Sequence, residues 1–292
     1  MNDGGKNIII VKGHRSRYRV IRKLGKGGQA FVYKATDLSE KRKHVALKVV
    51  NFKGCTEEEI YDSGTYKRFH WEYMLTSKLR HPQVATASDY GVDTDRQIAF
   101  MARNYLNGRT LTELLNQKHQ FTTEEANHII LSVAGILEYI HSQGVVHCDI
   151  KPSNVFMEYG DPILIDFGLA AGASAFGTYE RGISGTMAYM APEVIDPTLH
   201  KEYMYAPSRD WWGLGCVAYN IFTGKRMYRG NSESTRLRVE IMKAREQKLI
   251  QKALSGHETF PVVKALLERD PTKRPSSRAE LEAIINETRE SD

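Results

Sequence analysis

The sequence changes character near residue 108, from short strand-like segments to long helical ones, and this change most constrains the fold. Segments rich in β-branched and aromatic residues, separated by turn signals, are expected to be strands: residues 17–23, 30–35, 44–50, 84–92 and 97–104. Residues 57–79 are predicted to form a single helix that stops before His81-Pro82. The first hundred residues therefore predict a small sheet with one helix.

After Gly108 the pattern becomes helical. Residues 111–116 begin one helix, and Thr122 opens the next, with Glu125 three positions later as a capping box. Apolar residues then recur every three or four positions, at Ala126, Ile129, Ile130, Val133, Ile136, Leu137 and Ile140. Residues 207–223 contain a second apolar helix, and Ser277 with Glu280 caps the last one. We expect an α+β chain with a small β-rich lobe, a connector near 104–108 and a larger helical lobe.

Composition and termini exclude several classes of protein. No apolar run among the 292 residues approaches the roughly 20 needed to span a membrane, and the N-terminus has neither a signal-peptide nor a myristoylation pattern. Cys55, Cys148 and Cys216 lie far apart, which argues against a disulfide framework or a zinc site and for a reducing, cytoplasmic compartment. The densest basic cluster, residues 41–44, is interpreted as a solvated loop, so no nucleic-acid partner is expected.

A glycine-rich segment, residues 24–32, stands between two expected strands. Glycines let a backbone turn tightly and bring its N–H groups close to phosphate oxygens. Such a segment is often only a hairpin, so this signal is weak by itself. It is not a dinucleotide fingerprint because no helix follows it, and it lacks the Gly-Lys-Ser/Thr of a P-loop.

Lys48 interrupts the apolar strand expected at residues 45–50. Burying a lysine is unfavourable unless it has a partner, and Glu72 on the following helix is a plausible one. A lysine held in this way could fix anionic phosphates in place.

Two aspartates and an asparagine follow the long helix. Asp149 and Asn154 lie in the segment His147-Cys148-Asp149-Ile150-Lys151-Pro152-Ser153-Asn154, and Asp166-Phe167-Gly168 comes twelve residues later. Asn154 and Asp166 offer the hard oxygen ligands that Mg²⁺ prefers. Asp149 can then orient and deprotonate a hydroxyl nucleophile.

With these parts in this order, the chain resembles the protein kinase superfamily over nearly its whole length. Ala191-Pro192-Glu193 supplies the family's last motif. Asp210 resembles the family's buried helix aspartate, and Arg274 looks like the usual ion-pair partner of Glu193. The resemblance implies a bilobal kinase fold with an ATP cleft between the lobes. The implied boundaries are an extension at 1–16, an N-lobe at 17–105, a C-lobe at 106–288 and a tail at 289–292.

The resemblance also assigns roles. Lys48 would bind the α- and β-phosphates, the glycines would cover them, and Tyr105 and Leu106 would form the hinge beside the adenine. The implied ATP-binding set is Leu24, Gly25, Lys26, Gly27, Gly28, Val32, Ala46, Lys48, Glu72, Tyr105, Leu106 and Asp166. Asp149, Lys151 and Asn154 would be the catalytic residues, with Asn154 and Asp166 holding Mg²⁺, or Mn²⁺ as an alternative.

Two features favour serine and threonine as acceptors in a protein substrate. Lys151 stands two residues after Asp149, and residues 185–193 resemble the substrate-docking segment of serine/threonine kinases. Thr186 is expected to contact both Asp149 and Lys151. Thr178, Ser184 and Thr186 are the candidate activation-segment residues, and autophosphorylation is expected.

Four departures from the family pattern stand out. Ala30 stands where the family's glycine-rich loop has its third glycine, and we expect little loss of activity from this replacement. Counted back from Asn104-Tyr105, the gatekeeper position at the back of the adenine pocket falls on Arg103. Either Arg103 reaches a carboxylate, Glu72 or Asp166, or it points to solvent, or the register of this assignment is off by one residue. Cys148 replaces the usual arginine, so activity should depend only weakly on phosphorylation of the activation segment. The Cys148 side chain either fills the space of that arginine or acts as a redox switch. Residues 54–68 form a long connection that either regulates Glu72 or only fills space.

Two other functions compete with an active protein kinase. One is a pseudokinase that acts as a binding scaffold. It is disfavoured because a scaffold has no chemical need for all five of the residues that this chain contains: Lys48, Glu72, Asp149, Asn154 and Asp166. The other is a small-molecule phosphotransferase with a kinase-like fold, which usually lacks a long segment before Ala-Pro-Glu. The sequence leaves open the substrate protein, the oligomeric state, and whether the chain is a whole protein or an excised domain.

Overall fold

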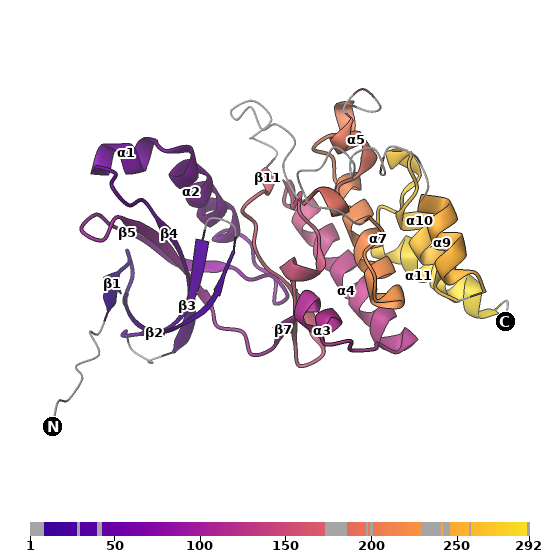
Figure 1. Cartoon of the computed structure of the whole chain (residues 1–292), viewed down its shortest axis with the longest axis horizontal. Coiled ribbons are helices and arrows are strands. Elements are labelled where there is room, and N and C mark those ends of the chain that lie inside the picture. The colour runs from indigo at the N-terminus through magenta and orange to yellow at the C-terminus, as the bar shows by residue number, and fades with distance from the viewer. Residues whose placement is uncertain are drawn as a thin grey trace. The chain divides into compact units, whose positions relative to one another are not determined.

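The chain divides into two compact units in a computed structural model. One unit contains residues 1–80 and 85–107, and the other contains residues 81–84 and 108–292. The structure describes residues 9–27, 30–39, 43–172, 186–196, 198, 201–228, 241, 246–256 and 258–290. Strands dominate the first unit and helices the second, which is the bilobal α+β architecture expected from the sequence (Figure 1).

The first unit is built on one antiparallel sheet. Its six strands lie in the order β1-β2-β3-β4-β6-β5. Their bounds are Ile10–Lys12 (β1), Arg17–Lys26 (β2), Ala30–Asp37 (β3), His44–Asn51 (β4), Ala87–Asp93 (β5) and Ile98–Asn104 (β6). The expected strand at 84–92 begins later, because Val84 instead forms an isolated bridge to Leu164 in the second unit.

The strand β1 was not predicted from the sequence, which assigned residues 1–16 to an extension. It pairs with β2 and buries only Val11. This alternation of exposed and buried residues is too short to predict a strand from the sequence. A contact distant in sequence fixes the turn after it: buried Asp89 accepts hydrogen bonds from the backbone N–H groups of Arg15 and Ser16. A Cβ on Gly13 would lie 2.2 Å from the Asp89 carboxylate, so this turn requires glycine.

The single helix predicted over 57–79 is wrong in detail. The structure has two helices, α1 (Glu57–Asp62) and α2 (Gly64–Thr76), separated by Ser63 in an extended conformation. The Ser63 backbone N–H donates to the carbonyl oxygen of Glu59, and its side chain accepts from the N–H of Tyr66. Ser63 therefore ends one helix and caps the next, because serine competes well for backbone hydrogen bonds.

The second unit consists mainly of helices. They are α3 (Leu111–Asn116), α4 (Thr123–Ser142), α5 (Pro192–Ile195), α7 (Ser208–Thr223), α9 (Glu246–Leu254), α10 (Phe260–Leu266) and α11 (Arg278–Glu290). Helix α4 has the predicted capping box between Thr122 and Glu125, and its predicted apolar stripe is buried. The N–H of Glu280 donates to the Ser277 hydroxyl, as predicted for the last helix. No helix in the described ranges is both long and apolar enough to span a membrane.

Two small sheets and α7 position the loops that follow α4. The strands β9 (Val155–Glu158), β10 (Asp161–Leu164) and β7 (Arg109–Thr110) form one sheet, and β8 (Val145–Val146) pairs with β11 (Ala171–Gly172). A Cβ on Gly213 of α7 would lie 2.8 Å from Ile150 Cβ. The absence of a side chain at 213 thus lets α7 pack closely beneath the loop that holds Asp149.

Candidate active site

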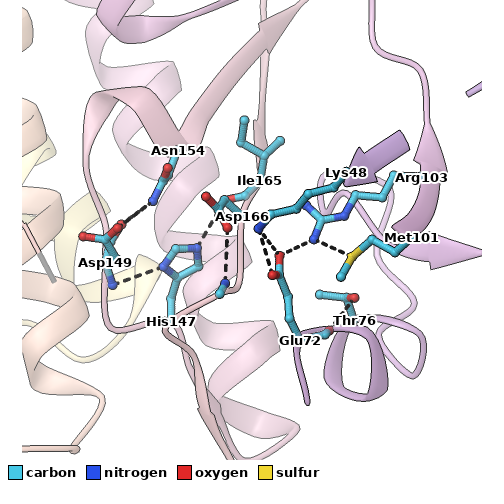
Figure 2. Close-up of polar contacts among 11 residues, drawn as sticks. Lys48, Glu72, Thr76, Met101, Arg103, His147, Asp149, Asn154, Ile165 and Asp166 are labelled. Atoms are coloured by element: carbon cyan, nitrogen blue, oxygen red, sulfur yellow. Dashed lines mark hydrogen bonds and ion pairs between the residues drawn. The ribbon is translucent and has the colours of Figure 1, made fainter. Parts of the chain in front are cut away.

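In the first unit, a buried carboxylate is shared by two cations. Lys48 on β4 donates to both Glu72 oxygens, at 2.9 and 2.8 Å, and Glu72 is only 2% exposed (Figure 2). The predicted Lys48–Glu72 pair is therefore present. Arg103 on β6 donates to the same carboxylate, so of the alternatives for Arg103, contact with Glu72 is confirmed.

The described residues of the glycine-rich segment lie at the ends of β2 and β3, which pair antiparallel. Gly25 lies near the end of β2, where it pairs with Val32, and the N–H of Gly27 donates to the carbonyl oxygen of Ala30 at 2.8 Å. A Cβ on Gly25 would meet nothing within 4 Å, so packing inside this unit does not explain the glycine. Gly28 lies outside the described residues.

The remaining candidate ATP residues of this unit lie on or beside the sheet. Register places Val32 opposite Lys48, and Ala46 opposite Arg103. Leu24 is 38% exposed, and the Nζ of Lys26 lies over the Phe31 ring at 5.7 Å. Tyr105, just after β6, has the Lys34 ammonium 4.3 Å from its ring centroid, and Leu106 follows it, half-buried.

In the second unit, Asp149 lies at the centre of a polar cluster. The Lys151 ammonium donates to Asp149 Oδ2 at 2.5 Å and to Thr186 Oγ1 at 2.6 Å. The backbone N–H of Thr186 donates to Asp149 Oδ1 at 3.0 Å. Both contacts expected of Thr186 are therefore present, although 35 residues separate it from Lys151.

Asn154 and Asp166 present oxygen atoms suited to a hard cation. The Asn154 amide nitrogen donates to the backbone carbonyl oxygen of Asp149 at 2.8 Å, which directs its amide oxygen elsewhere (Figure 2). Asp166 has a left-handed backbone with φ of 62°, and its Oδ1 accepts the N–H of Gly168. Within the described ranges no group of three or more His, Cys, Asp or Glu side chains could hold a metal.

His147 is a site residue to which sequence reasoning gave no role. The N–H of Asp149 approaches His147 Nδ1 at 3.3 Å, and Nε2 lies 3.4 Å from the carbonyl oxygen of Ile165. An N–H can only donate and a carbonyl can only accept, so these two contacts fit the tautomer with its proton on Nε2. The ring also packs on Phe167, with centroids 4.7 Å apart. His147 thus links the loop of Asp149 to the segment of Asp166. The sequence feature that could have predicted this role is the position of His147 two residues before Asp149.

Asp210 anchors the backbone of that loop from below. Its carboxylate accepts the N–H of His147 at 2.7 Å, the N–H of Cys148 at 2.8 Å and a hydrogen bond from His141 at 2.9 Å. Burial raises the pKa of Asp210, but the hydrogen bond from His141 and nearby positive charge outweigh burial, so the net pKa is lowered. The expected buried helix aspartate is thus present and holds Cys148 at a φ of 68°.

Cys148 is buried in an apolar cluster and has no fixed charge to offer. It packs with Val146 and Ala171, and Leu169 and Tyr205 lie against them. Its Sγ lies 3.5 Å from the carbonyl oxygen of Val146. The small side chain therefore fills apolar space, which supports the first of the two interpretations of Cys148.

The predicted Glu193–Arg274 ion pair is buried and bidentate. Arg274 Nη1 and Nη2 donate to Glu193 Oε1 and Oε2 at 2.6 and 2.9 Å, with 0% and 1% of the two side chains exposed. The guanidinium also lies over the Trp212 ring, 5.0 Å from its centroid. This pair ties the segment of α5 to the segment that precedes α11. Thr178 and Ser184, predicted for the activation segment, lie outside the described residues.

The fold and these clusters define a protein kinase catalytic domain, and comparison with known proteins agrees. The family model described as "protein kinase domain" matches residues 18–286. The chain belongs to this family, and the relatives described next are named serine/threonine-protein kinases.

Three relatives show the breadth of the similarity. The serine/threonine-protein kinase cds1 of Schizosaccharomyces pombe is 29% identical over 96% of this chain and 60% of its own length. The serine/threonine-protein kinase PrkC of Bacillus subtilis is 29% identical over 77% of this chain and 33% of its own. An inactive serine/threonine-protein kinase of Mus musculus, PLK5, is 29% identical over 89% and 41%. The chain thus spans between a third and three fifths of the length of these relatives.

Proposed function

We propose that this protein transfers the γ-phosphoryl group of ATP to serine and threonine hydroxyls of protein substrates, its own chain included. The observation that carries the proposal is the cluster of Asp149, Lys151 and Thr186. It holds a carboxylate and an ammonium 2.5 Å apart on a loop anchored by a buried aspartate. Because a relative as similar as the others bears the name "inactive", family membership alone does not supply the activity.

The chemistry needs positioning more than covalent assistance. The acceptor hydroxyl oxygen forms a bond to the γ-phosphorus while the bond from that phosphorus to the β–γ bridging oxygen breaks, which releases ADP. Asp149 orients the hydroxyl and takes its proton. Lys151, already paired with Asp149, stabilises the negative charge that spreads over the transferring oxygens. Thr186 holds the ammonium and the carboxylate in register.

The donor set of the second unit fits a magnesium ion. A carboxylate and an amide oxygen are ligands that Mg²⁺ accepts, and Mg²⁺ usually takes only one or two carboxylates with water and phosphate oxygens completing its shell. Asn154 has committed its amide nitrogen to Asp149, so its oxygen is the atom left to bind metal. Asp166 would supply the carboxylate. The bound ion would neutralise phosphate charge, and Mn²⁺ fits the same donors.

Residues of the first unit would hold ATP. Lys48 would contact the α- and β-phosphates, and Gly25 and Gly27 would let the hairpin backbone approach them. Leu24, Val32 and Ala46 would contact the adenine, and Tyr105 and Leu106 would flank it.

All three cysteines, Cys55, Cys148 and Cys216, are free thiols, which supports a reducing compartment such as the cytoplasm.

The test is phosphate transfer from labelled ATP with Mg²⁺ to a generic serine/threonine protein substrate and, in parallel, to a panel of small metabolites. Mass spectrometry maps the modified residues. Phosphoserine and phosphothreonine on the protein, absent from an Asp149→Asn control, are the expected result. Transfer to metabolites alone would favour a small-molecule phosphotransferase. ATP binding without transfer to either would favour a scaffold.

A further inference from the structure

Arg103 is a buried cation on a central strand. It lies on β6, between β4 and β5, with its backbone opposite Ala46 on one side and Ala87 on the other. Its side chain is 9% exposed, and the neighbouring Met101 is fully buried. A guanidinium in such surroundings is unfavourable unless specific partners compensate for the lost water.

The compensation comes from the carboxylate that Lys48 also uses. Arg103 Nη2 donates to Glu72 Oε1 and lies 3.1 Å from Met101 Sδ (Figure 2). Its Nε has no hydrogen-bond partner among the described residues. Glu72 is therefore the main compensation for this charge. Lys48, Glu72 and Arg103 taken as a triad carry one positive charge in excess.

The shared carboxylate determines what happens when Lys48 turns to a phosphate. With a lysine as the only cation, Glu72 would lose part of its compensation at that moment, while staying 2% exposed. An uncompensated buried charge is strongly destabilising. Because Arg103 contacts Glu72 from another strand, the carboxylate keeps a cation whatever Lys48 does.

We infer that Arg103 is a positioning residue, which holds Glu72 and hence helix α2 in place independently of Lys48. The inference rests on the phosphate-binding role proposed for Lys48. It has two consequences. Helix α2 keeps its position when the Lys48 charge is removed, and the excess positive charge of the triad favours binding of the anionic nucleotide.

The test is a double-mutant cycle with Lys48→Met, Arg103→Met and the double variant, since methionine keeps a straight apolar side chain without the charge. Hydrogen exchange of peptides covering α2, residues 64–76, reports how firmly the helix is held. Each single variant should raise the exchange rate by less than about tenfold, because the other cation remains. The double variant should exceed the larger single effect by on the order of 10²-fold, because Glu72 is then buried alone.

Kinetics and conservative variants separate positioning from simple packing. Arg103→Met should raise the KM for ATP by roughly tenfold through loss of a nearby positive charge, and Arg103→Lys should recover part of the loss. Arg96→Met is the matched control, because it removes a half-exposed arginine paired with Asp93 in the same unit. That control should leave both the exchange rate and the KM unchanged.

The outcomes separate this inference from the proposed function. Lys48→Met that retains full phosphate transfer would overturn the role proposed for Lys48. Lys48→Met that loses transfer, together with additive exchange effects in the cycle, would overturn the role of Arg103 alone. A rise in turnover for Arg103→Met would also overturn it, because it would show that Arg103 competes with Lys48 for Glu72.

Discussion

Removal of the Arg274 guanidinium should destabilise the helical unit severely. The Arg274 side chain is fully buried, and it satisfies both oxygens of Glu193, which is 1% exposed. The guanidinium also donates to the backbone carbonyl oxygens of Glu268, Ser208 and Arg269, at 2.6, 3.1 and 3.0 Å. Arg274→Ala leaves the carboxylate buried without a cation, and breaking such a pair costs about 3–5 kcal/mol of unfolding free energy.

Urea unfolding followed by tryptophan fluorescence measures this loss. Two of the three tryptophans, Trp211 and Trp212, are buried in α7, and Arg274 lies over one of them. Replacing Trp71 with phenylalanine in every sample confines the signal to this unit. Arg278→Ala is the control, because its pair with Glu282 is 49% and 42% exposed and is worth no more than about 0.5 kcal/mol. If Arg274→Ala fell within about 1 kcal/mol of that control, the reasoning about burial would be refuted.

Three further predictions concern Thr186, Asp210 and phosphorylation of the activation segment. Thr186→Val removes the hydroxyl that accepts a hydrogen bond from Lys151, and it should lower kcat by roughly 10- to 100-fold. The KM for ATP should stay unchanged. A rise in the KM for ATP as large as the fall in kcat would contradict this prediction. Asp210 has a lowered pKa in the folded state, so the folded protein binds fewer protons in acid than the unfolded chain, and stability falls as the pH drops below the ordinary value of 3.8. The difference in unfolding free energy between the wild type and Asp210→Asn should therefore shrink below that pH, and a constant difference would argue against the assignment. Phosphorylation of Thr178 or Ser184 should raise turnover by less than about tenfold, because Cys148 cannot form a charge-assisted bond to phosphate; a much larger rise, in turnover measured before and after mapped phosphorylation, would contradict it.

Local patterns in the sequence predicted much of the fold. The capping box at Thr122 and Glu125 and the periodic apolar stripe after it depend only on neighbouring residues, and both are present as expected. The contacts of Lys48, Thr186 and Arg274 were predicted from motifs that occur in a fixed order in the kinase family. Their geometry agrees with the expectation, while the roles of these residues in transfer remain predictions.

The features that sequence reasoning missed depend on distant contacts or on competition between local ones. The short strand β1 is stabilised by Asp89, which is 74 residues away from Arg15. The break at Ser63 reflects a serine side chain that competes with the helix for backbone donors. The partner of Arg103 depended on how β6 lies beside β4, and the sequence left two carboxylates open.

The most direct test of the role proposed for Asp149 is the single-turnover rate of phosphate transfer by wild type and Asp149→Asn, with ATP affinity measured on the same samples. The substituted amide would keep the shape of the side chain but could not take the hydroxyl proton. If Asp149 takes the hydroxyl proton, the rate should be lower by on the order of 10²–10⁴-fold, with an unchanged Kd for ATP. A rate within about tenfold of wild type, or a loss of ATP binding, would contradict the role given to Asp149.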